Sequence, residues 1–226
     1  YKKEFNDHKK FKINERVIYD LKFWKENLPK MNYSTPFWYI LGDVREPDII
    51  MYTDACENKI TQAYGGIDTT GNWFSENFRN TKFIHFINLS TKLINVMELI
   101  AIIVNIDMNK NLYKNKYIFI RCDNKVAIEW ILKKRASFSA ITEKFVCVCL
   151  KYLFKILIEN KIYIGAKYIP SEDNTYADNL SRLYAEPFND IQYDLLDYVP
   201  NDVPLNPSGI VNKIIEKFEI DRKSVV

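Results

Sequence analysis

Glycine, proline and histidine are scarce in this chain of 226 residues, which contains 6, 8 and 2 of them respectively. The shortage of glycine and proline excludes a collagen-like chain, and no repeat typical of a solenoid is visible. Apolar residues make up 47% of the chain and aromatic residues 15%, which also excludes a disordered or linker-like chain. The length is enough for one sizeable domain with flanking segments.

The 4 cysteines show no spacing typical of a metal site. Cys147 and Cys149 form a C-x-C in an apolar run, and no second pair of ligands follows them. His8 and His85 are distant in the sequence, so we do not expect a zinc site. Cysteines without a pairing pattern favour a reducing compartment. We therefore expect an intracellular protein, in the nucleus or cytoplasm, that is not secreted.

Long hydrophobic runs are also missing, because charged residues interrupt the longest apolar stretches. We therefore expect no membrane span. The chain begins at Tyr1 without a signal-like segment, and we expect it to be part of a longer polypeptide. The net charge of +3 permits a polyanionic partner without requiring one. Basic clusters at residues 2–3, 9–12 and 133–135 are, taken alone, explained by a solvated surface.

The hydrophobic pattern predicts a mixed α/β fold. Runs typical of strands occur at residues 48–53, 59–66, 72–75, 116–122 and 161–169, with 82–87 completing the third strand and leading to a helix. Helical periodicity covers residues 14–31, 93–108, 124–134, 138–160 and 175–183. This order indicates a mixed sheet with helices on its faces.

We expect three parts along the chain. Residues 1–45 form an N-terminal helical connection segment, and residues 46–185 form the main domain. Residues 186–226 form a C-terminal extension, in which a helix near 210–218 lies outside the core.

Four carboxylates occupy informative positions in this pattern. Asp54 and Asp123 follow predicted strands, and Glu98 and Asp178 lie in predicted helices. If the two strands are parallel neighbours, both aspartates emerge at the edge of the sheet where open α/β sheets bind ligands. Gathered carboxylates are costly without a cation among them, and hard divalent cations prefer oxygen ligands. The sequence therefore predicts a site for two Mg²⁺ ions, with Mn²⁺ able to substitute, suited to phosphodiester chemistry.

Each carboxylate also has an ordinary structural explanation. An aspartate after a strand, such as Asp54 or Asp123, is typical of turns and N-caps. A glutamate within a helix, such as Glu98, is usually at the surface, and Asp178 could stabilise a helix N-terminus. The conjunction is informative only if the fold brings the four together.

The same segments resemble the RNase H domain of retroelement reverse transcriptases, most closely those of DIRS-type (tyrosine-recombinase) retrotransposons. The matching pieces are YTDAC, INVMELIAI, RCDNKVAIEWI and YIPSEDNTYADNLSR. The last is the most specific, because its pattern I-P-x-x-x-N-x-x-A-D-x-L-S-R is long and ungapped. The similarity is strong from about residue 46 to 185, and LKFWKENLP resembles the segment that joins the polymerase to RNase H in such elements.

The resemblance implies an RNase H-like fold, with a mixed five-stranded sheet flanked by helices. It also implies a metal-dependent endoribonuclease that hydrolyses the RNA strand of RNA–DNA hybrids. Asp54 would bridge two metal ions, Glu98 and Asp123 would complete one metal site, and Asp178 would hold the other. The implied partners are the hybrid and a reverse transcriptase polymerase domain in the same polypeptide, either in an element or in a protein derived from one.

Candidate substrate contacts follow from the need to bind phosphates and 2′-hydroxyls. Lys133 to Arg135 could form a basic protrusion, while Arg182 is equally explained by an ion pair and Asn124 by a turn. The candidates are Asn124, Lys133, Lys134, Arg135, Asn174 and Arg182.

The chain departs from its relatives at three positions. They often have His where Tyr168 stands and Gly where Ser171 stands, and Cys56 replaces a Ser. No His lies between Asp123 and Asp178, so the histidine-assisted product release of some cellular relatives has no residue to carry it. None of these changes removes a carboxylate.

Two other functions stay open at this point. One is a catalytically retired scaffold or nucleic-acid-binding module with the same fold, although all four carboxylates remain. The other is a nuclease or integrase of the same broad fold that acts on DNA, although the fourth carboxylate is unlike a three-carboxylate integrase.

Overall fold

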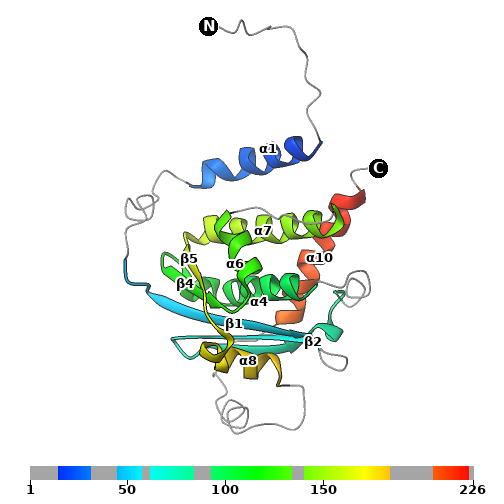
Figure 1. Ribbon diagram of the computed structural model, residues 1–226. Coiled ribbons are helices and arrows are strands. Elements are labelled where there is room, and N and C mark those ends of the chain that lie inside the picture. The colour runs from blue at the N-terminus through cyan, green and yellow to red at the C-terminus, as the bar shows by residue number, and fades with distance from the viewer. Residues whose placement is uncertain are drawn as a thin grey trace, which may run out of the picture.

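The computed structural model describes residues 15–31, 45–57, 62–83, 93–133, 140–183 and 206–223. Five strands form one sheet in the order β3-β2-β1-β4-β5 (Figure 1). The strands are β1 (Ile49–Glu57), β2 (Gln62–Asp68), β3 (Trp73–Asn77), β4 (Tyr117–Cys122) and β5 (Tyr163–Tyr168). The pairs β1–β2 and β2–β3 are antiparallel, whereas β1–β4 and β4–β5 are parallel. This mixed five-stranded sheet, with helices on its faces, confirms the predicted fold class.

Helices cover the two faces of the sheet unequally. On one side lie α4 (Ile94–Met108), α6 (Lys125–Lys133) and α7 (Ala140–Asn160), while α8 (Thr175–Ser181) lies on the other (Figure 1). Shorter elements connect them, namely α5 (Lys110–Tyr113) and the 3-10 helices η1 (Leu28–Met31), η2 (Phe78–Asn80) and η3 (Ser171–Asp173). Nearly every residue of α4 is buried, because this apolar helix packs against both the sheet and α7.

The first strand is longer than the sequence pattern predicts. Its parallel pairing with β4 ends where Thr53 lies opposite Cys122, but its antiparallel pairing with β2 continues until Glu57 lies opposite Gln62. Asp54 therefore lies within β1 rather than after it. The partner strand, and not the local run of apolar residues, decides where β1 ends.

Other boundaries also differ from the predictions. The second strand ends at Asp68, two residues beyond the predicted end, because its pairing follows β1, and residues 59–61 of the predicted run are not among the described residues. Lys82 and Phe83 follow η2 without forming a strand, and residues 84–87 lie outside the described part of the chain.

The C-terminal helix α10 (Pro207–Lys223) corrects the expectation that the tail lies outside the core. Its residues at helical spacing, including Ile214 and Phe218, are buried in the main hydrophobic core. Phe218 meets Phe145 of α7 edge-on, with ring centroids 5.1 Å apart. An ion pair of 2.8 Å between Lys82 and Glu216 ties α10 to the segment after η2. The helix therefore belongs to the domain built around the sheet.

The N-terminal helix α1 (Glu15–Asn27) contacts α7, where Asp20 pairs with Lys151 at 2.7 Å. Among the described residues, no helix has the length and apolar character needed to cross a membrane.

Candidate metal centre

The ends of two adjacent parallel strands bring Asp54 and Asp123 together. Because Thr53 lies opposite Cys122, the next residues along β1 and β4 are these two aspartates. Asp54 is 4% exposed and accepts a hydrogen bond from the hydroxyl of Ser181 in α8. Asp123 is half-buried and accepts a 2.6 Å hydrogen bond from Ser171 in η3. The condition set in the sequence analysis, that these two strands are parallel neighbours, is thus met.

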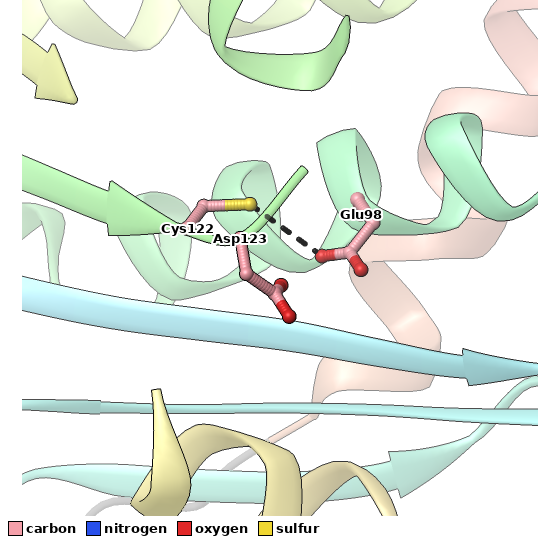
Figure 2. A group of neighbouring side chains, drawn as sticks. All are labelled: Glu98, Cys122 and Asp123. Atoms are coloured by element: carbon pink, nitrogen blue, oxygen red, sulfur yellow. Dashed lines mark hydrogen bonds between the residues drawn. The ribbon is translucent and has the colours of Figure 1, made fainter. Parts of the chain in front are cut away.

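Glu98 reaches the same place from the first turns of α4. Its carboxylate is 4% exposed and accepts hydrogen bonds from the backbone N–H of Ala55 and, at 3.6 Å, from the thiol of Cys122. The possible ligand atoms of Glu98, Cys122 and Asp123 all lie within 4.8 Å of one another. Figure 2 shows these three side chains side by side, where the end of β4 meets α4. Asp54 and Asp178 are not members of this tighter group.

Asp178 lies on the opposite side of the sheet, in α8. It is half-buried, and Arg182 donates to the same carboxylate oxygen from Nε and Nη2, each at 2.8 Å. Its negative charge nevertheless raises the pKa of Asp54, so the two carboxylates are close enough to repel each other. Asp54 therefore lies between the charges of Asp123 and Asp178, and a single site formed by all four residues stays a prediction.

The pKa shifts reflect the cost of gathering these charges. Burial, followed by the charges of Asp123 and Asp178, raises the pKa of Asp54 to about 7, although Ser181 and Arg182 oppose the change. Burial and the neighbouring aspartates, Asp54 and Asp123, raise the pKa of Glu98 well above its ordinary value. A cation placed among these oxygens would remove this penalty.

The donor set fits a hard divalent cation better than zinc. It consists of carboxylate oxygens, and Mg²⁺ prefers a few such ligands together with water. Cys122 belongs to the group geometrically, but burial and the adjacent Glu98 raise the pKa of its thiol well above the ordinary value. A sulfur atom is in addition a soft ligand, whereas Mg²⁺ prefers hard oxygen ligands. We infer that Glu98 and Asp123, without Cys122, would hold an ion here.

Three residues at the site were not among the functional residues predicted from the sequence. The hydroxyls of Ser171 and Ser181 bond to Asp123 and Asp54, and the thiol of Cys122 bonds to Glu98. Ser181 stands about one helical turn after Asp178, a spacing that could have indicated a shared face. Nothing local to Cys122 or Ser171 indicates their partners, which come from distant segments.

Two of the residues predicted to contact substrate make hydrogen bonds within the protein. Asn124 caps α6 by accepting from the N–H groups of Val126 and Ala127, at 3.1 and 3.0 Å. Asn174 is 1% exposed, and its amide donates to the carbonyl of Thr53 at 3.0 Å, next to Asp54. Their contact with a substrate stays a prediction.

The predicted basic contacts are described only in part. Lys133 is exposed and pairs with Glu129 at 2.6 Å, and Arg182 is exposed beside Asp178. Lys134 and Arg135 lie outside the described residues. The predicted basic protrusion therefore stays a prediction.

No family model and no curated protein sequence matches the chain. Solved structures that match include LC11-RNase H1 in complex with an RNA/DNA hybrid, at 17% identity over 59% of this chain and 93% of that one, with a TM-score of 0.45. The N-terminal RNase H domain of a Mycobacterium tuberculosis protein matches at 14% identity over 67% and 98% of the two chains, with a TM-score of 0.42. RNase H1 of Halobacterium salinarum matches at 13% identity over 58% and 92%, with a TM-score of 0.43. The functional proposal rests on the side chains of the site and not on these likenesses.

Proposed function

We propose that this chain is a metal-dependent endoribonuclease that hydrolyses the RNA strand of RNA–DNA hybrids. The observation that supports the proposal is the close approach of Glu98 and Asp123, beside the buried Asp54, whose pKa is raised by the charges of Asp123 and Asp178. Buried carboxylates that repel one another are costly, and such a cluster is typical of sites that bind divalent cations. The resemblance of the same four segments to retroelement RNase H supplies the substrate class.

The four carboxylates have different roles in the proposed reaction. Two Mg²⁺ ions, when bound, would activate the attacking water and stabilise the leaving oxygen of the phosphodiester. Glu98 and Asp123, which have oxygens within 4.8 Å of each other, would hold one ion, and Asp178 would contribute to the other. The resemblance of its segment to retroelement RNase H implies that Asp54 would contribute to both ions. Manganese has the same preference for oxygen ligands and would substitute.

The hydroxyls around the site orient the carboxylates. Ser181 donates to Asp54 and Ser171 donates to Asp123, so one oxygen of each carboxylate is already engaged. The remaining lone pairs are left for a cation. Such outer hydrogen bonds fix the direction of metal ligands and are needed for tight binding.

The proposal includes a biological context. On the resemblance of these segments, we propose that the chain is part of a retroelement reverse transcriptase, or of a protein derived from one, with a polymerase domain in the same polypeptide. We propose that it works inside the cell, in the nucleus or the cytoplasm.

The direct test is cleavage of a labelled RNA–DNA hybrid with Mg²⁺, compared with duplex RNA, duplex DNA and single-stranded RNA. We expect cleavage of the hybrid alone, with chelator abolishing it. Asp54→Asn and Asp123→Asn should each lower the rate at least about 100-fold, because each removes an anionic ligand of the ions that would stabilise the transition state. Asp20→Asn in α1 is the matched control and should leave the rate unchanged. Cleavage retained in the Asp54→Asn, Asp123→Asn double variant would remove the assignment.

A retired nucleic-acid-binding module is the second candidate, and one contact favours it. Arg182 already neutralises Asp178, so an ion that used this carboxylate would have to compete with the guanidinium. Binding of the hybrid without any Mg²⁺-dependent cleavage would support the module. Cleavage of duplex DNA but not of hybrid would instead indicate a DNA nuclease of the same broad fold.

A further inference from the structure

One half of the outer sheet face has no helix over it among the described residues. The helix on that side, α8, packs against β1, β2 and β3, whereas β4 and β5 form the other half of the sheet (Figure 1). Burial alternates along β4, where Ile118, Ile120 and Cys122 are buried and the residues between them are half-buried. This alternation is typical of a sheet with one face on the core and one facing solvent.

Strand register identifies the residues that share this open face. Paired residues on adjacent strands point to the same side of a sheet, as do alternate residues along one strand. On the open side, Tyr117 of β4 lies opposite Tyr163 of β5, and Arg121 of β4 lies opposite both Lys167 of β5 and Tyr52 of β1. We call the resulting set the aromatic sheet face, made of Tyr52, Tyr117, Phe119, Arg121, Tyr163 and Lys167.

A glycine allows the rings to spread across this face. Gly165 lies opposite Phe119, and a Cβ added to it would lie 2.3 Å from Tyr117 Oη and 2.8 Å from the Phe119 ring. The two rings therefore occupy the space above Gly165, with their centroids 6.4 Å apart. Tyr163 stands beside them, opposite Tyr117. The result is a broad surface of half-exposed aromatic rings on a rigid sheet.

The charge of this face is positive. Arg121 donates to Tyr52 Oη at 2.9 Å and stacks over the same ring, while Lys167 is exposed. Within the described ranges, neither cation pairs with a carboxylate. At the end of the face beside Tyr117, Asp48 is engaged by Arg45 and by the backbone N–H of Tyr117, and at the other end Asp54 and Asp123 belong to the candidate metal centre. An anionic partner with stackable groups is complementary to this surface.

The basic end of the face adjoins the candidate metal centre. Tyr52 precedes Asp54 by two residues on β1, and Arg121 precedes Asp123 by two residues on β4. Asp54 points to the same side as Tyr52, because its carboxylate bonds to Ser181 of α8. A polymer that lies across the face would therefore continue directly to the acidic site.

We propose that the aromatic sheet face binds a single-stranded nucleic-acid tail that extends from the duplex held at the metal centre. Bases would stack on Tyr117, Phe119 and Tyr163, and phosphates would contact Arg121 and Lys167. Stacking on aromatic rings beside a positively charged groove is how proteins bind single strands without reading their sequence. This proposal rests on the proposed function for the position of the duplex. The single-strand binding surface itself is argued only from the residues of the aromatic sheet face.

The first test measures binding of a labelled oligothymidylate, which the proposed nuclease does not cleave, to the full chain. Lys167→Glu should weaken binding about 10-fold at about 0.1 M salt and lower the slope of log K against log salt by about 0.7. Tyr163→Leu keeps the apolar bulk but removes the ring, and should weaken binding by roughly 10-fold. Lys25→Glu in α1, on the other side of the sheet, is the matched control and should change nothing.

The second test maps the contact by photo-crosslinking an oligonucleotide that carries halogenated uridine. We expect crosslinked peptides from β4 and β5. Unchanged affinity in both face variants, with crosslinks elsewhere, would overturn the proposal. Self-association lost in Lys167→Glu, with affinity for the oligonucleotide unchanged, would also overturn it and assign the face to a second copy of the chain.

These outcomes separate the two proposals. Hybrid cleavage by the unmodified chain together with absent single-strand binding would refute the aromatic sheet face and leave the nuclease standing. Crosslinks to the aromatic sheet face without hybrid cleavage would refute the proposed nuclease activity and support the proposed binding surface.

Discussion

Two buried carboxylates dominate the chemistry at the scale of single residues. Asp54 and Glu98 are each 4% exposed, and burial is the largest cause of the raised pKa of both. Each has hydrogen-bond donors, but the cation whose charge reaches Asp54 is Arg182, which is already engaged by Asp178. Without a bound ion, ionisation of these groups therefore opposes folding.

Stability without metal should fall as pH rises from about 4 to about 7. In this interval the unfolded chain has lost the proton of Asp54, whose ordinary pKa is 3.8, while the folded chain retains it up to about 7. The folded state therefore binds more protons, and the free energy of unfolding decreases with pH by up to about 1.4 kcal/mol per pH unit. Urea unfolding in chelator at several pH values measures this slope.

The test variant is Asp54→Asn, which should make the slope shallower by the contribution of this carboxyl while that of Glu98 remains, and the matched control is Asp20→Asn, which should keep the full slope. A slope that is the same in Asp54→Asn and in the unmodified chain would contradict the assigned protonation of Asp54.

Close packing of α8 on the sheet decides the geometry of the site at the scale of elements. A Cβ on Gly65 would lie 2.7 Å from Leu180 Cβ and 2.9 Å from the backbone nitrogen of Ser181. Because those atoms belong to α8, no side chain can enter without displacing the helix. The same helix carries Asp178 and the hydroxyl that bonds to Asp54.

Gly65→Ala should therefore damage the site more than a glycine substitution usually does. We expect a loss of stability of about 1–3 kcal/mol from overpacking, and a fall in hybrid cleavage of about 100-fold as Asp178 and Ser181 move. Gly209→Ala in α10, where the neighbour is the flexible side chain of Asn206, is the control and should leave cleavage intact. Unchanged cleavage in Gly65→Ala would show that the position of α8 is not critical.

At the scale of the whole molecule, one core supports the acidic site. The sheet, α4, α7 and α10 share a single cluster of buried apolar residues. The site lies where β1, β4, α4 and α8 meet, so its ligands are correctly placed only when the domain is folded. A cation that binds there binds the folded state alone, and so stabilises the domain as a whole.

Divalent ions should therefore raise the melting temperature. With Mg²⁺ or Mn²⁺ at about 100 times its dissociation constant, we expect a rise of roughly 5–10 °C near pH 8. Near pH 5 the rise should be smaller, because protons compete for Asp54 and Glu98. Thermal unfolding with and without ion, in the unmodified chain and in Glu98→Gln, measures the effect. An equal rise in Glu98→Gln would place the ion elsewhere.

The sequence alone determined the elements and the identity of the four carboxylates. Alternating or continuous apolar runs and helical periodicity are local properties, so they predicted the strands and helices and the class of the sheet. Asp54 and Asp123 could be placed together because two parallel strands that end at the same edge bring their next residues close.

Only the tertiary structure decided the rest, because it depends on partners that are distant in the sequence. Pairing with β2 extends β1 beyond Asp54. The helix α10 packs into the main core, which its own sequence did not predict. The hydrogen bonds of Ser171 and Ser181, and the aromatic sheet face, likewise arise where separate segments meet. Local preference chooses the type of each element, but burial and charge at a site are set by which elements pack beside it.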